Sequence, residues 1–278
     1  MASLADSGSS IAPAIEWQQR HTLVTRVTHW VRLVAMVCLI GSGLQIFNAY
    51  PRLHWGKFGS DHDTAWLAIE ASGTPPKGSV TIGGTEFASP VLGVTIREGA
   101  PVFQAFPGEL TIPATRDLSS GRRWHFFWAW VFVLNGLLYL GSGLATGALQ
   151  KKMFPTRAQL SPAHLWIEIK EHARFHFPKS EGARNYNAIQ KLTYLAVLFV
   201  LLPLMVLTGL TMSPGVSAVL PLADLFGGRQ SARSLHFIGM NLLIAFIIVH
   251  VGLVLITGFW NLMRSMITGK FAIEKGVY

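Results

Sequence analysis

The chain has 278 residues, of which half are hydrophobic and only 13% are charged. Soluble domains carry about 25% charged residues, so this composition excludes an ordinary soluble protein and indicates an integral membrane protein. The net charge of +9 does not indicate a nucleic-acid-binding protein, because the basic residues cluster beside apolar runs, where they act as topology signals.

Four apolar runs are long enough to cross a bilayer as helices, which takes about 20 apolar residues. They span residues 23–47, 124–146, 188–212 and 234–259. They predict an all-α membrane protein, namely a four-helix transmembrane bundle with a long outer loop and a cytoplasmic interfacial helix. We expect residues 1–20 to form a polar, loosely ordered segment and residues 21–278 to form one transmembrane domain.

The first two predicted helices are joined by a long polar connection, residues 48–121. Gly83 and Gly84 lie between short β-prone runs and predict a hairpin there. A loop of this length usually has a function. Two interpretations stay open, a cap on the bundle and a docking platform for a partner. His54 and His62, which also lie in this loop, are expected to have structural roles.

The segment 151–187 is basic, and its sequence from Ser161 onward predicts an amphipathic helix lying on the membrane surface. His172 and His176 have an i,i+4 spacing that can bind metal, but no third ligand is near, so a solvated pair is expected. The basic residues of the segment are Lys151, Lys152, Arg157, Lys170, Arg174, Lys179 and Arg184.

The distribution of basic residues predicts the orientation. Positive residues favour the cytoplasmic side of short loops. The segment 151–187 and the C-terminal tail are basic, whereas 213–232 holds Arg229 as its one basic residue before Arg233 opens the last helix. We therefore expect a bacterial inner-membrane protein with both termini in the cytoplasm and the loop 48–121 in the periplasm.

Histidines are the candidate metal ligands. The single cysteine, Cys38, excludes an intrachain disulfide, a cysteine-ligated iron–sulfur cluster and a CxxCH haem attachment site. Histidine inside a membrane span is rare and usually functional. Four of the ten histidines lie in the predicted spans: His29, His125, His236 and His250.

These four histidines sort into two pairs by depth. His236 and His250 are fourteen residues apart on the last helix, so they share one face and lie about 21 Å apart along its axis. The alternating helix directions then match His125 with His236 near the outer edge and His29 with His250 near the inner edge. Two opposed imidazoles at each depth are typical of bis-histidine b haems, so we expect two haem b groups. The alternative is four core histidines that only donate hydrogen bonds.

Glycines and arginines lie near the two expected haem levels. Glycines in the first two helices, at the depth where each helix offers no ligand, can let a flat macrocycle approach the backbone. Five arginines are candidate partners of the haem propionates, although ordinary interfacial anchoring explains them equally well. They are Arg26, Arg32, Arg122, Arg123 and Arg233.

Motifs in all four helices resemble one bacterial family. They are RVTHW in the first helix, GRRWHFFWAWVFVLNGLLYL in the second, YNAIQK at the start of the third and LHF with VHV in the fourth. These resemble the dihaem b-type cytochrome subunits of formate dehydrogenases, nickel–iron hydrogenases and thiosulfate reductases, within the bacterial cytochrome b561 group.

The resemblance implies a membrane anchor that reacts with quinone and exchanges electrons with a periplasmic oxidoreductase subunit. It implies the same ligand pairing, and it places a quinone beside the start of the third helix. Asn187 and Gln190 are the candidate quinone residues there, and Ile189 stands where formate-dehydrogenase-type members have glycine. The long outer loop is similar to that of a subgroup that accompanies sulfite-oxidase-like molybdopterin proteins.

Three functions compete at this stage. The leading hypothesis is a membrane-anchoring dihaem cytochrome b subunit that transfers electrons between a periplasmic partner and the quinone pool. The alternative is a self-sufficient quinone oxidoreductase of the superoxide-oxidase type. A transporter or a structural membrane scaffold is disfavoured, because neither has a use for depth-paired histidines. The helix cores also lack the Asp and Glu residues that a proton-coupled transporter needs for a proton relay.

Overall fold

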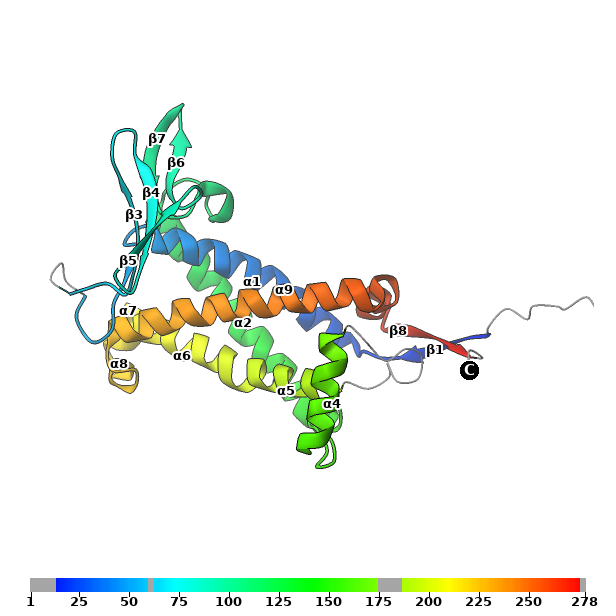
Figure 1. Ribbon diagram of the computed structural model, residues 1–278. Helices are drawn as coiled ribbons and strands as arrows, with labels where there is room; N and C mark the ends of the chain where they lie inside the picture. The colour runs from blue at the N-terminus through cyan, green and yellow to red at the C-terminus, as the bar shows by residue number, and fades with distance from the viewer. Residues whose placement is uncertain (1–13, 60–62, 175–186, 276–278) are drawn as a thin grey trace, which may run out of the picture.

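The computed structural model describes residues 14–59, 63–174 and 187–275. Within them, four helices are long and apolar enough to cross a membrane, which confirms the predicted bundle (Figure 1). They are α1 (Leu23–Phe47), α2 (Leu118–Ala145), a third span running from Ala188 to Met212, and α9 (Arg229–Thr268). His62 and His176, with Lys179 and Arg184, lie outside the described residues.

The second helix begins six residues earlier than expected, at Leu118 instead of Trp124. The reason is a cap, because the Asp117 carboxylate accepts a hydrogen bond from the backbone N–H of Ser120 at 3.0 Å. Hydrogen bonds from the Ser120 side chain and backbone hold the pKa of Asp117 below its ordinary value. The helix therefore begins about two turns before the apolar run.

The third span is not a uniform helix. It consists of α5 (Ala188–Ala196), a π-turn at Val197–Leu201 and α6 (Leu202–Met212). The π-turn directly precedes Pro203, which lacks a backbone N–H and cannot complete a regular α-helical ladder. The wider turn therefore accommodates the proline without ending the span.

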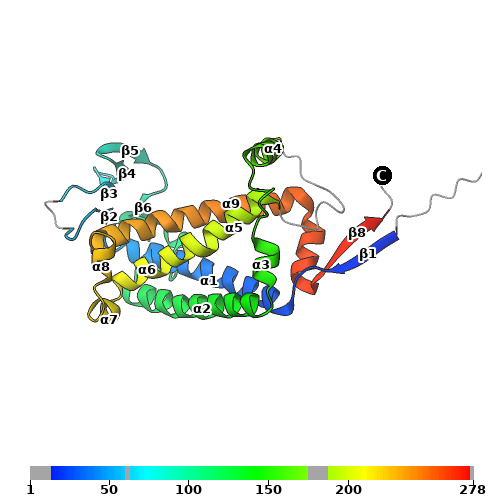
Figure 2. The ribbon, with the colours of Figure 1, turned by 90° about the horizontal axis from the view of Figure 1, so that it is seen from below.

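The last helix is longer than expected and is broken near its end. Gly258 has φ 127° and ψ 65°, a conformation that favours glycine, so α9 is two helices joined at this residue. The break falls next to the expected end at Phe259. The segment after Gly258 turns away from the bundle axis (Figure 2).

The helices pack as two hairpins. One pairs α1 with α2, the other pairs α6 with α9, and α1 approaches α9 closely at few positions. Asn135 joins the first hairpin, because its Nδ2 donates to the Thr28 carbonyl at 2.9 Å in a buried contact. This is the interhelical role that a buried amide in a membrane span is expected to have.

The outer loop folds into strands, so the all-α description holds only for the membrane part. A four-stranded antiparallel sheet contains β2 (Arg52–Leu53), β3 (Leu67–Ser72), β4 (Lys77–Ile82) and β5 (Thr85–Ser89). The predicted hairpin at Gly83 and Gly84 joins β4 to β5, with positive φ at both glycines. A second hairpin pairs β6 (Gly93–Arg97) with β7 (Ala100–Gln104), and a short 3-10 helix, η1 (Gly108–Leu110), follows.

The sheet is fastened to the end of the bundle. Its core side chains Leu53, Leu67 and Ile69 pack with Phe47 of α1, and Phe237 of α9 packs against this cluster. Ser234 donates to the His54 carbonyl at 2.6 Å and accepts from the Trp66 indole N–H at 2.9 Å. The loop therefore has a defined structure fixed to α9.

The first and last described strands pair at the opposite end of the bundle (Figure 1). Strand β1 (Ala14–Gln19) pairs antiparallel with β8 (Lys270–Lys275). The expectation that residues 1–20 are loosely ordered is therefore wrong for 14–19.

Short helices complete the described fold. They are α3 (Ala148–Met153), α4 (Pro162–Ala173), α7 (Pro214–Ser217) and α8 (Leu222–Leu225). Helix α4 lies where the interfacial helix was expected.

Candidate functional site

The four membrane histidines face one another in two pairs. His125 of α2 lies opposite His236 of α9, with ring centroids 6.2 Å apart, at the end of the bundle that carries the outer-loop strands β2 to β7. His29 of α1 lies opposite His250 of α9, with ring centroids 6.5 Å apart, nearer the chain ends. We call these the sheet-side pair and the terminus-side pair. Each joins the α1–α2 hairpin to α9.

The separation of the rings matches the space for a metal ion. Two imidazoles that share one metal through bonds of about 2.0 Å hold their centroids about 6 Å apart. The separation in each pair therefore leaves the space that one metal ion between two imidazoles would need.

Hydroxyl groups fix the ring orientation in the sheet-side pair. Ser42 Oγ lies 3.1 Å from His125 Nδ1, and Thr208 Oγ1 lies 2.9 Å from His236 Nδ1. Each hydroxyl donates its own proton to a helix carbonyl four residues back, Cys38 O or Leu204 O. The hydroxyls must therefore accept from the imidazole Nδ1–H, which leaves Nε2 of each ring free to bind a metal.

The terminus-side pair is surrounded by polar atoms that lack partners. Among the described residues, His29 Nδ1 and the Arg32 atoms Nε and Nη2 are buried without a hydrogen bond. A buried cation without a partner is costly, so such a position usually faces an anionic group. Aromatic rings complete the surroundings, because Phe246 stacks on His250 at 5.8 Å and Tyr194 meets it edge-on at 6.5 Å.

Glycines leave room beside both pairs. A Cβ at Gly43 or Gly209 would come within 3.4–3.5 Å of the His125 or His236 ring, so these glycines let the rings pack against a helix backbone. Gly136 is eleven residues after His125, about three turns on the same face of α2, and nothing lies within 4 Å of its Cβ position. The residues present therefore fit a flat, doubly ligated, anionic cofactor such as haem.

Comparison with known proteins agrees with this chemistry. Residues 20–269 match the family model described as prokaryotic cytochrome b561. The chain belongs to the prokaryotic cytochrome b561 family. It is similar to a putative protein-methionine-sulfoxide reductase subunit, YedZ1, of Azospira oryzae, with 29% identity over 232 residues that cover 82% of this chain and 86% of the relative. No solved structure matches the chain.

Family membership establishes the coarse function. This b561 cytochrome is a membrane-spanning haem protein of electron transport, and its cofactor is haem b. Because all four predicted spans lie within the matched residues, the described bundle is the cytochrome b561 domain itself.

The five candidate propionate arginines of this cytochrome have different surroundings. Arg32 lies over the Tyr139 ring at 5.0 Å, and its buried Nε and Nη2 have no hydrogen-bond partner among the described residues. Arg26 donates to the Ile267 carbonyl, yet its Nε is buried without a partner among the described residues. Arg26 and Arg32 thus both remain available near the terminus-side pair.

The other three arginines have weaker support as propionate partners. Arg122 and Arg123 are exposed, and Arg123 donates to Ser120 Oγ at 2.9 Å. Arg233 donates to the carbonyls of Tyr50 and Arg52 and thereby fastens the outer loop to α9. Its guanidinium thus joins two parts of the protein, which is neither the propionate contact nor the membrane-interface anchoring that the sequence suggested.

The candidate quinone residues of this cytochrome lie at the N-terminus of α5. The Asn187 Oδ1 accepts from the Gln190 backbone N–H at 2.9 Å and caps the helix. Gln190 follows on the first turn, and Tyr194, one turn later, reaches His250. Tyr194 thus connects the first turns of α5 to the His250 ring.

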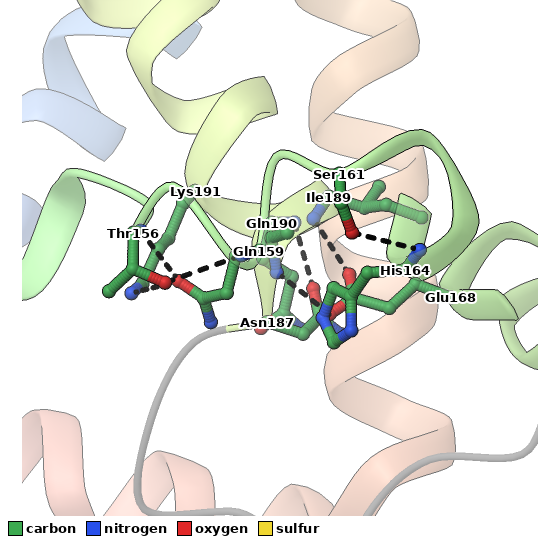
Figure 3. A network of polar contacts seen from close by, with 10 residues as sticks. Thr156, Gln159, Ser161, His164, Glu168, Asn187, Ile189, Gln190 and Lys191 are labelled. Carbon is green, nitrogen blue, oxygen red and sulfur yellow. Dashed lines mark hydrogen bonds and ion pairs between the residues drawn. The ribbon is translucent and has the colours of Figure 1, made fainter. Parts of the chain in front are cut away.

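Sequence reasoning missed the residues that support these sites. Ser42 and Thr208 are ordinary helix residues in the sequence, and only the fold brings them to His125 and His236. It also missed His164 and Glu168 of α4, which join the N-terminus of α5 (Figure 3). The i,i+4 spacing of these two was a signal for an ion pair, but it gives no indication of the contact with α5.

Proposed function

We propose that this cytochrome is a dihaem electron-transfer subunit that connects the membrane quinone pool to a partner oxidoreductase. The observation that carries the proposal is the presence of two histidine pairs, at two depths, each with the ring separation of a shared metal ion. A second feature supports it, because α9 contributes one histidine to each pair and so places the two sites in series.

The chain's own residues would hold and tune the cofactors. His125 with His236, and His29 with His250, would hold one haem b each. Haem supplies one-electron exchange at iron. Ser42 and Thr208 orient the sheet-side imidazoles and increase their electron donation, and Arg32 would offset negative charge at the terminus-side site.

The two ends of the bundle would serve different partners. Asn187 and Gln190 offer amide groups to a quinone near the terminus-side pair, while the β-rich outer loop would dock a periplasmic oxidoreductase near the sheet-side pair. The relative from Azospira oryzae is named as a subunit of a protein-methionine-sulfoxide reductase. By analogy, electrons would pass from quinol to the partner, and both termini would lie in the cytoplasm. The partner class expected from the long loop is a molybdopterin protein.

The test is a reduced-minus-oxidised absorption spectrum of the purified chain, with a haem-to-protein ratio. The expected ratio is two, with low-spin b-type bands and reduction of both haems by a quinol. The double variant His236→Ala, His250→Ala should retain neither haem. A double variant with full haem content would refute the ligand assignment, and superoxide consumption by the chain alone would favour the self-sufficient enzyme.

A further inference from the structure

A polar network at the start of α5 has no role in the function described so far. It joins α4 to α5 (Figure 3), at the bundle end away from strands β3 to β7 (Figure 1). Its centre is Glu168, whose side chain is only 10% exposed, next to His164, whose side chain is 43% exposed. A carboxylate this buried near a membrane span is costly unless its partners compensate it fully.

The side chain of Glu168 accepts hydrogen bonds from the backbone of α5. Oε1 accepts from the Ala188 backbone N–H at 3.1 Å, and Oε2 accepts from the Ile189 backbone N–H at 3.0 Å. These are unpaired donors of the first turn of α5, where the helix dipole also favours negative charge. Glu168 is therefore held in place by the N-terminus of α5.

Glu168 also fixes the adjacent imidazole. His164 Nε2 lies 2.9 Å from Glu168 Oε1, and an ionised carboxylate can only accept, so the ring donates through Nε2–H. This leaves Nδ1 as the nitrogen that can accept a proton, with no partner among the described residues. A histidine held by a carboxylate in this way is the arrangement of a general base, because the carboxylate stabilises the imidazolium that forms.

The position of His164 connects water to the candidate quinone residues. Its exposed edge can return a proton to the aqueous phase, and Figure 3 shows it beside Asn187 at the same end of α5. Tyr194, two turns along α5, contacts the His250 ring at 6.5 Å. A quinol at Asn187 would thus have a proton acceptor on one side and the terminus-side pair on the other.

We propose that His164, oriented by Glu168, is the base that takes a proton from the hydroxyl of a quinol bound at Asn187. The proposal rests on the proposed function, since it needs quinol to react at this end of the bundle. Oxidation of one quinol to quinone breaks two O–H bonds and releases two electrons, which leave for two ferric haems, and two protons. His164 takes the first proton at Nδ1 and passes it to water, and the second proton leaves by the same route. Glu168 is a positioning residue.

Other charged groups near the pair are already engaged or point to solvent. Among the described side chains, Lys191 of α5 is buried and donates to Gln159 Oε1 at 3.1 Å and to the Phe154 carbonyl. Lys170 and Glu171 of α4 are exposed, as is Lys151 of α3, which packs against α5. None of these offers a second base at Asn187.

The experiment measures haem reduction by a short-chain quinol in the purified full-length chain, by stopped flow, between pH 5 and 9. In the wild type the rate should rise with pH, because the base must be unprotonated to accept. His164→Gln keeps a donor for Glu168 but cannot carry a proton, so the rate should fall on the order of a hundredfold and lose its pH dependence. Glu168→Gln should also slow the reaction, because the carboxylate that orients the His164 ring is lost, and Glu171→Gln on the exposed face of α4 is the matched control.

A binding measurement separates chemistry from folding. The fluorescence of heptylhydroxyquinoline N-oxide, a quinol analogue, should be quenched by the wild type with an affinity that depends on pH. This pH dependence should disappear in His164→Gln, whose haem content should stay unchanged.

Unaltered rates and pH profiles in His164→Gln, alongside a reactive wild type, would overturn the assignment of His164 alone. A wild type that no quinol reduces would overturn the proposed quinone function, and this inference with it.

Discussion

Replacing Thr208 by valine tests the orientation of the sheet-side ligands. Thr208 is fully buried, and its Oγ1 is the acceptor for His236 Nδ1 at 2.9 Å. Valine keeps the shape of threonine but removes the acceptor, so the imidazole N–H is left without a partner. An unsatisfied buried donor costs about 1–3 kcal/mol. The same range corresponds to the ten- to hundredfold loss of affinity that is typical when a group behind a metal ligand is removed.

The redox potential should change in a defined direction. The hydrogen bond increases the electron density on the imidazole and so stabilises ferric iron. Its loss should raise the midpoint potential of one haem by about 40 mV per kcal/mol of weakened interaction. Redox titration and haem content of the purified variant measure both effects, and the second haem should titrate as in the wild type.

Thr211→Val is the matched control. Thr211 is also buried on α6, one turn later, but its hydroxyl bonds only the Leu207 carbonyl at 2.9 Å. If both variants shifted the potential equally, or neither did, the argument that Thr208 fixes the ligand tautomer would be refuted.

Three further predictions follow from the same geometry. His29→Ala should reduce the haem-to-protein ratio from two to one, and an unchanged ratio in the pyridine haemochrome assay would exclude His29 as a ligand. Arg32→Gln removes a buried cation beside the terminus-side pair and should lower the midpoint potential of that haem, whereas the exposed Arg122→Gln should leave it unchanged. Asn135→Ala removes the hydrogen bond to the Thr28 carbonyl and should destabilise the bundle by about 1 kcal/mol in detergent unfolding. Asn135→Asp also lacks the donor and places a carboxylate in the span, so it should destabilise the bundle at least as much.

The membrane part could be predicted because two local rules determine it. A span needs a minimum length of apolar residues, and a helix advances by a constant rise per residue. These rules gave the four helices, and they matched His125 with His236 and His29 with His250, as the fold now arranges them. No long-range information was needed, since the membrane aligns the helices.

The parts that could not be predicted depend on contacts between distant residues. Strand β1 exists because β8 pairs with it, more than 250 positions later, and a two-stranded ribbon has little stability alone. Likewise, the role of Glu168 requires the N-terminus of α5, which follows a separate segment of chain. Helix α2 begins before its apolar run begins, because the Asp117 cap, and not hydropathy, decides where the helix starts.

The contribution of α9 to both histidine pairs has a consequence for biogenesis. The ribosome makes this helix last, so His29 and His125 enter the membrane long before His250 and His236 are available to face them. Neither pair can be completed during most of translation, and a chain cut before α9 would present two unmatched imidazoles to the bilayer. Cofactor loading at either pair would therefore have to wait until α9 has entered the membrane.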